Sequence, residues 1–413
     1  MEKKHIKVTL VDLWRINNAK GGTEKVFFDM ADNLQQRGFQ VVGLYYDTTP
    51  GKPAFYTNPE ATFQNLFPLE KGNTRSTQRN FTSFINLSFE DLLYRFKPTY
   101  HRLSQVFPFL HMPARWIKNI LLDSKRASRF KSKINEINSD IFICFQPEAT
   151  HLLISALNIK KPIITMFHMS PSLQFHRDGT AYHSSLRKCS CIQTLMPEFV
   201  EQIQKTLNSN NVVCIPNIVP QHRLINNRKS KTISFLGRFD RVQKRPHLLV
   251  QAFALLKEEF PDWDVKLYGE TSIDQDYFSF IQKIIKDNSL NSHVKIMGPT
   301  DSPLLALQQC SIFVFPSAFE GFGLALTEAM SLGVACVGFK NCDAVNSLIK
   351  DHRNGLLCGS GPAGLASSLK SLMQDENLRI RIGNQAKKDM EEYSPNKVWQ
   401  RWEDLIMLHT NRL

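Results

Sequence analysis

The chain has 413 residues, of which 42% are hydrophobic and 22% are charged. These fractions are ordinary for a packed globular protein, and they exclude a disordered chain, a collagen-like chain and a coiled-coil rod. Lys and Arg number 51 against 38 Asp and Glu, which gives a formal net charge of +13. A chain this basic is expected to meet an anionic partner, such as a nucleotide, a nucleic acid or an acidic membrane surface.

Neither a membrane span nor a secretion signal is predicted. No stretch of the sequence reaches the roughly 18 apolar residues of a spanning helix. The first apolar run, residues 6–11, is too short for the core of a signal peptide and is typical of a strand. The eight cysteines include no CxxC pair, and only Cys189 and Cys191 lie close together. We therefore expect reduced, mostly buried thiols in a cytoplasmic protein.

Strand-like and helix-like segments alternate along the chain, a pattern typical of parallel α/β sheets. A first series of strands is expected at residues 6–11, 41–46, 141–145, 162–167, 189–195 and 212–215. A second series is expected at residues 232–236, 265–268, 294–297, 312–315 and 334–339. Helices are expected between them, for example at 23–37, 246–260 and 324–332, and an amphipathic helix at 396–409 ends the chain.

The break between the two series of strands falls at residues 216–220, where two prolines enclose a short polar stretch. Such a stretch is typical of a hinge. We therefore predict an N-terminal domain over residues 1–218, a second domain over 219–394 and a closing C-terminal helix over 395–413.

One segment, residues 71–133, does not show this alternation of strand-like and helix-like stretches. It contains 13 Lys and Arg against three acidic residues, and ten Phe, Tyr and Trp side chains are interleaved with them. Basic residues with exposed aromatics favour an anionic lipid surface, which would place the protein at the inner face of the cytoplasmic membrane. A solvated helical face over core aromatics is the alternative. Nucleic acid is disfavoured, because the sequence has no RNP, zinc-finger or helix-turn-helix signature.

Two loops that follow predicted strands are candidate phosphate sites. Gly21 and Gly22 come after the first strand and open a helix, so backbone N–H groups there can meet an anion. The pattern is not the GxGxxG dinucleotide fingerprint, so a nicotinamide enzyme is disfavoured. Arg238 and Lys244 flank the loop after the strand at 232–236, and two cations at such a strand end can neutralise a diphosphate leaving group.

The strongest motif covers residues 315–330, a strand, a glycine-containing loop and a helix. It contains two carboxylates eight positions apart, Glu320 in the loop and Glu328 within the helix. Gly321 and Gly323 let the backbone approach a ligand, and the N–H groups of residues 322–324 can bind phosphate. Glu328 is suited to accept hydrogen bonds from a ribose diol.

With these three motifs in this order, the chain resembles the retaining glycosyltransferases of family 4. The resemblance implies an α/β fold of the GT-B type, with two facing Rossmann-like domains and a central cleft that closes at the hinge. It further implies that the second domain holds a nucleotide-diphospho-sugar. Arg238 and Lys244 would bind the diphosphate, Glu328 would bind the ribose, and Glu320 with Phe322, Gly323 and Leu324 would bind the sugar and phosphate.

The same resemblance gives a role to two further residues and to the glycine pair. His168 follows the strand at 162–167, where family members commonly place a histidine against the transferred sugar. Gly269 follows the strand at 265–268 and is predicted to line the donor site. Gly21 and Gly22 would meet the donor when the domains close.

The predicted catalytic set is therefore His168, Glu320, Arg238 and Lys244, without an obligatory metal or other cofactor. The predicted donor is a UDP- or GDP-sugar, and the predicted acceptor is a saccharide or glycolipid of a bacterial surface glycan such as lipopolysaccharide or capsule. The alternative is a catalytically silent, membrane-associated binding protein on the same fold. The intact Arg238, Lys244, Glu320 and Glu328 disfavour that alternative.

Overall fold

The computed structural model describes residues 6–14, 16–19, 21–47, 49, 51–53, 55, 62–66, 130–221 and 230–410. Most of the basic aromatic segment 71–133 lies outside the described residues. Contacts between residues divide the chain into two compact units, Met1–Ile163 and Ile164–Leu413. The strands form two separate sheets, and the predicted boundary at residue 218 lies in the stretch between the last strand of one and the first strand of the other.

The first sheet has seven strands in the order β3-β2-β1-β4-β5-β6-β7, and the strand pairs β1–β2, β1–β4, β2–β3, β5–β6 and β6–β7 are parallel. Its strands are β1 (Lys7–Asp12), β2 (Gln40–Tyr45), β3 (Thr62–Asn65), β4 (Ile141–Cys144), β5 (Ile163–Met166), β6 (Cys191–Thr194) and β7 (Val212–Cys214). Its helices are α1 (Gly22–Gln36), α5 (Pro147–His151), the π-helix η3 (Leu152–Ala156), α6 (Pro171–Asp178), α7 (His183–Lys188) and α8 (Pro197–Leu207).

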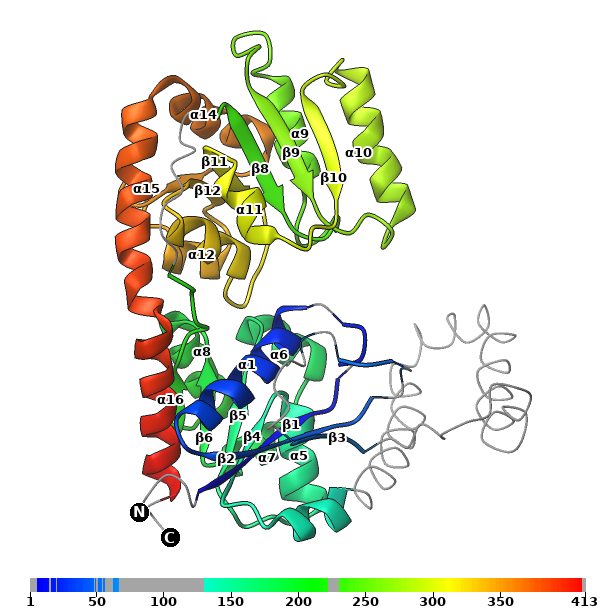
Figure 1. The fold of residues 1–413 in the computed structure, drawn as a ribbon, viewed down its shortest axis with the longest axis vertical. Helices are drawn as coiled ribbons and strands as arrows, with labels where there is room; N and C mark the ends of the chain where they lie inside the picture. Colours follow the sequence, from blue (N-terminus) through cyan, green and yellow to red (C-terminus); the bar gives the residue numbers. More distant parts are fainter. Residues whose placement is uncertain are drawn as a thin grey trace, which may run out of the picture. The chain divides into compact units, whose positions relative to one another are not determined.

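The second sheet has six parallel strands in the order β10-β9-β8-β11-β12-β13. They are β8 (Thr232–Leu236), β9 (Asp264–Tyr268), β10 (Val294–Gly298), β11 (Ile312–Phe315), β12 (Ala335–Phe339) and β13 (Leu356–Cys358). The helices are α9 (His247–Ala254), α10 (Gln275–Asp287), α11 (Pro303–Gln308), α12 (Leu324–Ser331), α13 (Asp343–Leu348), α14 (Gly361–Gln374), α15 (Glu376–Met390), the 3-10 turn η4 (Glu391–Tyr393) and α16 (Pro395–Thr410). Figure 1 shows α9, α10, α12, α14 and α15 beside this sheet.

Strand β11 shows why the second sheet is covered on both faces. All four of its residues are buried, and successive side chains point to opposite faces of a strand. Ile312 and Val314 pack into a core cluster with residues of α9, α10 and α14. Phe313 and Phe315 pack into a second cluster with residues of α12, α13 and α15. A continuous apolar strand of this kind is typical of a parallel sheet between two helical layers.

In each sheet the strand order reverses once along the chain. The reversal lies between β1 and β4 in the first sheet and between β8 and β11 in the second. In open parallel sheets, ligands bind outside the carboxyl ends of the strands at such a switch point. The loops after these four strands are therefore the first places to examine for function.

Every predicted strand is observed within a few residues of its expected limits, and the closing helix is observed as α16. Two strands were not predicted: β3, whose four residues include only one apolar side chain, and β13, which has three residues at the edge of its sheet. The helix expected at 246–260 ends earlier, at Ala254. There the Leu255 and Leu256 N–H groups turn to carbonyls three residues back, which tightens the chain so that Trp263 enters the core.

Burial of the cysteines is observed as expected, since seven of the eight free thiols are buried. Burial raises the pKa of Cys189 to about 11 and that of Cys310 to about 12, so these thiols stay protonated and unreactive near neutral pH. Within the described ranges, none of the helices is long and apolar enough to cross a membrane.

Candidate functional site

Three consecutive residues after β8 each contact the loop that follows β11. The Gln243 carbonyl accepts a hydrogen bond from the Ala318 N–H at 2.8 Å. Lys244 Nζ donates to Glu320 Oε1 at 2.5 Å, and Arg245 Nε donates to the Pro316 carbonyl at 2.9 Å. The loop of residues 238–245 and the loop of residues 316–323 are thus joined at the switch point of the second sheet.

Lys244 and Glu320, two of the predicted site residues, form a buried ion pair although they are 76 positions apart. Only 16% of the Lys244 side chain and 8% of the Glu320 side chain are exposed. The ammonium group also lies 5.1 Å from the centre of the Phe315 ring. Each charge compensates the other, since a buried charge without a partner is strongly disfavoured.

Arg238, the other predicted diphosphate ligand, is exposed at the start of the same loop. Its Nη2 donates to Gln243 Oε1 at 3.1 Å, and Gln243 Nε2 in turn donates to the Phe319 carbonyl at 3.3 Å. The amide of Gln243 therefore connects Arg238 to the loop that contains Glu320. A solvent-exposed guanidinium that donates to a neutral amide remains available to an anionic ligand.

The loop of residues 316–323 leads into the amino-terminal end of α12. Gly323 is the N-cap residue, with φ at +92°, a left-handed conformation that favours glycine. The Phe322 side chain is buried and packs edge-on against Tyr393, with the ring centres 5.7 Å apart. Any ligand contact of Phe322 is thus made by its backbone. Leu324 starts the helix, and Glu328 is half-buried one turn further on.

Gly269 has a structural task that the sequence did not reveal. Its φ is +150°, and a Cβ atom on it would lie 1.8 Å from the carbonyl oxygen of Gly237. The Gly237 N–H donates to the Tyr268 carbonyl, and the Gly269 N–H donates to the Gly298 carbonyl. Gly269 therefore packs directly beneath the start of the loop that contains Arg238 and Lys244; its predicted contact with the donor stays a prediction.

His168 follows β5 and lies beside the Glu320 loop. A Cβ atom on Gly321 would be 2.1 Å from the His168 carbonyl oxygen, so the two backbones touch. Burial lowers the pKa of His168 to about 4, which keeps the imidazole neutral at physiological pH. A neutral imidazole can donate one hydrogen bond and accept another, which suits contact with a sugar hydroxyl.

Gly21 and Gly22 open α1 in the first unit, as predicted. Gly21 is the N-cap residue, and no side chain caps the helix there. The Glu24 carboxylate folds back so that a Cβ atom on Gly21 would lie 2.3 Å from Glu24 Oε2. An anion binding at this helix end would have to displace that carboxylate, and the phosphate role of the two glycines stays a prediction.

A buried carboxyl that sequence reasoning missed ends β1, at the switch point of the first sheet. Asp12 is 1% exposed, and its Oδ1 accepts hydrogen bonds from the Trp14 N–H at 2.7 Å and from Gln146 Nε2 at 2.6 Å. Gln146 Oε1 accepts from the Leu13 N–H. Glu148 Oε2 accepts from the Trp14 indole at 3.1 Å. An aspartate directly after an apolar strand could have pointed to this site, but the strand pattern alone gives that residue no functional meaning.

Burial raises the pKa of Asp12 to about 7, although hydrogen bonds from Trp14 and Gln146 oppose the rise. The unfolded carboxyl ionises near its ordinary value of 3.8, so the folded protein binds this proton more tightly. Stability from this group is therefore present below pH 4 and is lost as the pH rises towards 7. Between pH 5 and pH 8 this loss is worth about 3 kcal/mol, and we expect Asp12→Asn to remove it when urea unfolding is compared at the two pH values.

Asp47, after β2, is the matched control for this experiment. Burial acts to raise its pKa, but hydrogen bonds from the N–H groups of Asn17, Thr49 and Ile16 lower it below its ordinary value. Asp47→Asn should therefore destabilise the protein by the same amount at pH 5 and at pH 8, and it should cost less only below about pH 4. The interpretation of Asp12 would be wrong if Asp12→Asn altered the dependence of stability on pH between pH 5 and pH 8 no more than Asp47→Asn does.

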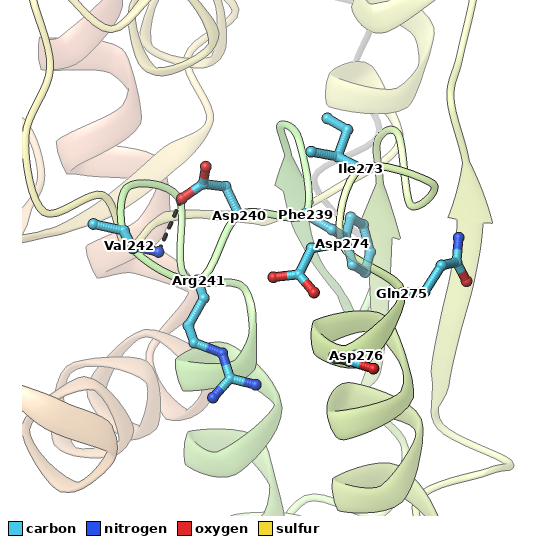
Figure 2. Close-up of a pocket in the computed structure, with 8 residues that line it drawn as sticks. All are labelled: Phe239, Asp240, Arg241, Val242, Ile273, Asp274, Gln275 and Asp276. Atoms are coloured by element: carbon cyan, nitrogen blue, oxygen red, sulfur yellow. Dashed lines mark hydrogen bonds between the residues drawn. The ribbon is translucent and has the colours of Figure 1, made fainter. Parts of the chain in front are cut away.

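A cavity of about 490 Å³ opens at the carboxyl ends of β8 and β9. Figure 2 shows its two sides, residues Asp240–Val242 on one and Ile273–Asp276 on the other. Asp240 Oδ1 accepts from the Val242 N–H, and Asp274 caps α10 through the Tyr277 N–H. Arg241 lies over the rings of Tyr277 and Phe280. The Arg241 contacts link residues 240–242 to α10.

Within the residues that the structure describes, no three His, Cys, Asp or Glu side chains are grouped as a metal site would require. Residues 220–389 match the family model of the group 1 glycosyl transferases. This matched region includes Arg238, Lys244, Gly269, Glu320 and Glu328.

Two known proteins that resemble parts of the chain are named as glycosyltransferases. An uncharacterized glycosyltransferase of Haemophilus influenzae is 23% identical over 53% of this chain and 61% of its own length. The poly(glycerol-phosphate) alpha-glucosyltransferase of Bacillus subtilis is 32% identical over 37% of this chain and 22% of its own length. The chain thus spans about three fifths of the first relative and about a fifth of the second.

Solved structures resemble the whole chain. A mutant of TarM from S. aureus, in complex with fondaparinux, alpha-GlcNAc-glycerol and UDP, has a TM-score of 0.70 and 14% identity. The match covers 97% of this chain and 99% of that one. The fold is therefore of the GT-B type, with two Rossmann-like parallel sheets flanked by helices, as the sequence predicted.

Proposed function

We propose that the protein is a retaining glycosyltransferase that transfers a sugar from a nucleotide-diphospho-sugar to a saccharide or lipid-linked acceptor. The Lys244–Glu320 pair carries this proposal. It places a cation and a carboxylate together at the switch point of a parallel sheet, inside the region that matches the group 1 glycosyl transferases. UDP is the first candidate for the nucleotide, because TarM was solved with UDP.

In this proposal Arg238, Lys244 and the amino-terminal end of α12 bind the diphosphate. Their positive charge stabilises the negative charge that develops when the bond between the anomeric carbon and the phosphate oxygen breaks. The acceptor oxygen forms the new bond on the same face of the sugar, and its proton passes to the departing phosphate. These cations take the part that a divalent metal plays in other transferases.

Glu320 and His168 would contact the transferred sugar, and Glu328 would accept hydrogen bonds from the ribose. The close backbone contact between Gly321 and His168 supports a joint role for the two side chains. The acceptor is proposed to belong to a bacterial surface polymer, because the Bacillus subtilis relative is named for poly(glycerol-phosphate).

Thermal unfolding with UDP, GDP, ADP, CMP and their common sugar conjugates tests this function. We expect one nucleotide family to raise Tm, since a ligand at 100 times its Kd adds about 2.7 kcal/mol. Release of that nucleoside diphosphate with added surface-glycan acceptors would then measure transfer, and NMR of the product would show retention at the anomeric carbon. A folded protein that responds to none of these nucleotides would refute the proposal and favour a silent binding protein.

A further inference from the structure

The residue next to Lys244 adopts a backbone conformation that its side chain disfavours. Arg245 has φ at +50°, in the left-handed region, where a residue with a Cβ atom is strained. Its N–H donates to the Asp240 carbonyl at 2.8 Å, which closes the loop. Because of this turn of the backbone, Lys244 and Arg245 both reach the loop after β11, Lys244 through Glu320 and Arg245 through Pro316.

The Arg245 side chain connects three strand ends. It starts in the loop after β8, donates from Nε to the Pro316 carbonyl just after β11, and places its guanidinium 5.1 Å from the centre of the Phe339 ring at the end of β12. Among the described residues, its buried Nη2 has no hydrogen-bond partner. A strained backbone and an unsatisfied buried donor both cost stability, so the arrangement is not explained by stability alone.

We propose that Arg245 is a positioning residue for the reaction, one that acts through Pro316 to fix the loop of residues 316–323 and so holds Glu320 against Lys244. This inference rests on the proposed function for its catalytic consequence, whereas the loop order that it predicts can be measured without any substrate. Pro316 lies four residues before Glu320, and Gln243 holds Ala318 and Phe319 between them. Arg245 thus fixes the start of this loop at Pro316, and Lys244 fixes the same loop further on, at Glu320.

Lysine cannot replace this arginine. The planar guanidinium donates from Nε to the Pro316 carbonyl while its Cζ lies 5.1 Å from the centre of the Phe339 ring. A lysine ammonium is a point charge that cannot satisfy both contacts with one geometry. A displacement of about 1 Å in a catalytic group lowers rates by up to about 100-fold.

Two variants separate positioning from stability. Arg245→Met keeps the strained backbone and removes both the Nε hydrogen bond and the unsatisfied Nη2, so kcat should fall without a matching fall in Tm. Arg245→Gly also relieves the backbone, so its Tm should be higher than that of Arg245→Met while kcat stays about 10- to 100-fold low with the donor KM little changed. Arg241→Met is the matched control, because Arg241 lies over the Tyr277 and Phe280 rings rather than on the Glu320 loop.

Hydrogen exchange of the free protein gives the second readout. Amides of residues 316–323 should exchange faster in both Arg245 variants and at the wild-type rate in Arg241→Met. Wild-type kcat and exchange in Arg245→Gly, or an equal loss in Arg241→Met, would overturn the proposal. If the wild type transfers no sugar, the proposed function fails by itself, and the exchange rates of 316–323 alone decide whether Arg245 orders the loop.

Discussion

Replacing Glu320 by glutamine is expected to lower sugar transfer by about 100- to 1000-fold and, at the same time, to strengthen binding of UDP. In the free protein the Glu320 carboxylate neutralises Lys244 at 2.5 Å, so a diphosphate must compete with it for the ammonium group. Glu320→Gln removes this competing charge and keeps the side-chain volume. The gain in affinity should be up to about tenfold, measured by calorimetry with UDP and with GDP.

Glu328→Gln is the matched control for that experiment. Glu328 stands eight positions further along, one turn into α12, and the proposal assigns it to the ribose. Its replacement should weaken nucleotide binding, in contrast to the effect at Glu320. Lys244→Met is a poorer comparison, because it leaves Glu320 buried without its cation. Weaker UDP binding in Glu320→Gln would show that the ion pair does not compete with the donor.

Gly269→Ala is expected to be the most destabilising small substitution in the second sheet. The new Cβ atom would lie 1.8 Å from the Gly237 carbonyl, and the φ of +150° is itself unfavourable for alanine. Overpacking and backbone strain together should cost about 3–5 kcal/mol and lower Tm by roughly 10 °C. Calorimetric unfolding measures the change directly.

Two other glycines separate the causes. Gly298 has φ at +72° with open space around the position of its Cβ, so Gly298→Ala tests the backbone strain alone. Gly359 has open space and no positive φ, so Gly359→Ala should change Tm by little. A loss at Gly269 no larger than that at Gly298 would mean that the contact with Gly237 relaxes at low cost.

The apolar strands were predictable because parallel strands between two helical layers are buried on both faces. β11, with Ile312 to Phe315 all buried, shows this pattern in four residues. The edge strand β3 was not predicted, because its four residues include only one apolar side chain. The helix at 246–260 was predicted too long, since only the tertiary fold requires the chain to turn at Leu255 and bring Trp263 inside.

The candidate site was predictable in its residues and less so in its contacts. Lys244 and Glu320 were each expected at the end of a strand, yet their direct pairing depends on β8 and β11 being neighbours in the sheet. The task of Gly269 depends on a contact with Gly237 that no local pattern contains. Asp12 was missed because its significance comes from burial beside Gln146, a residue 134 positions away.

The cysteine thiols of the folded protein are expected to react slowly with thiol reagents. Seven of the eight cysteines have a raised pKa, with burial as the main cause, so thiolate-selective reagents should meet few reactive groups in the folded chain. A cysteine introduced at Val242, which is 70% exposed, would then be the preferred point of attachment for a maleimide dye. Such a dye would sit two residues from Lys244 and report by its fluorescence when a ligand reaches that loop.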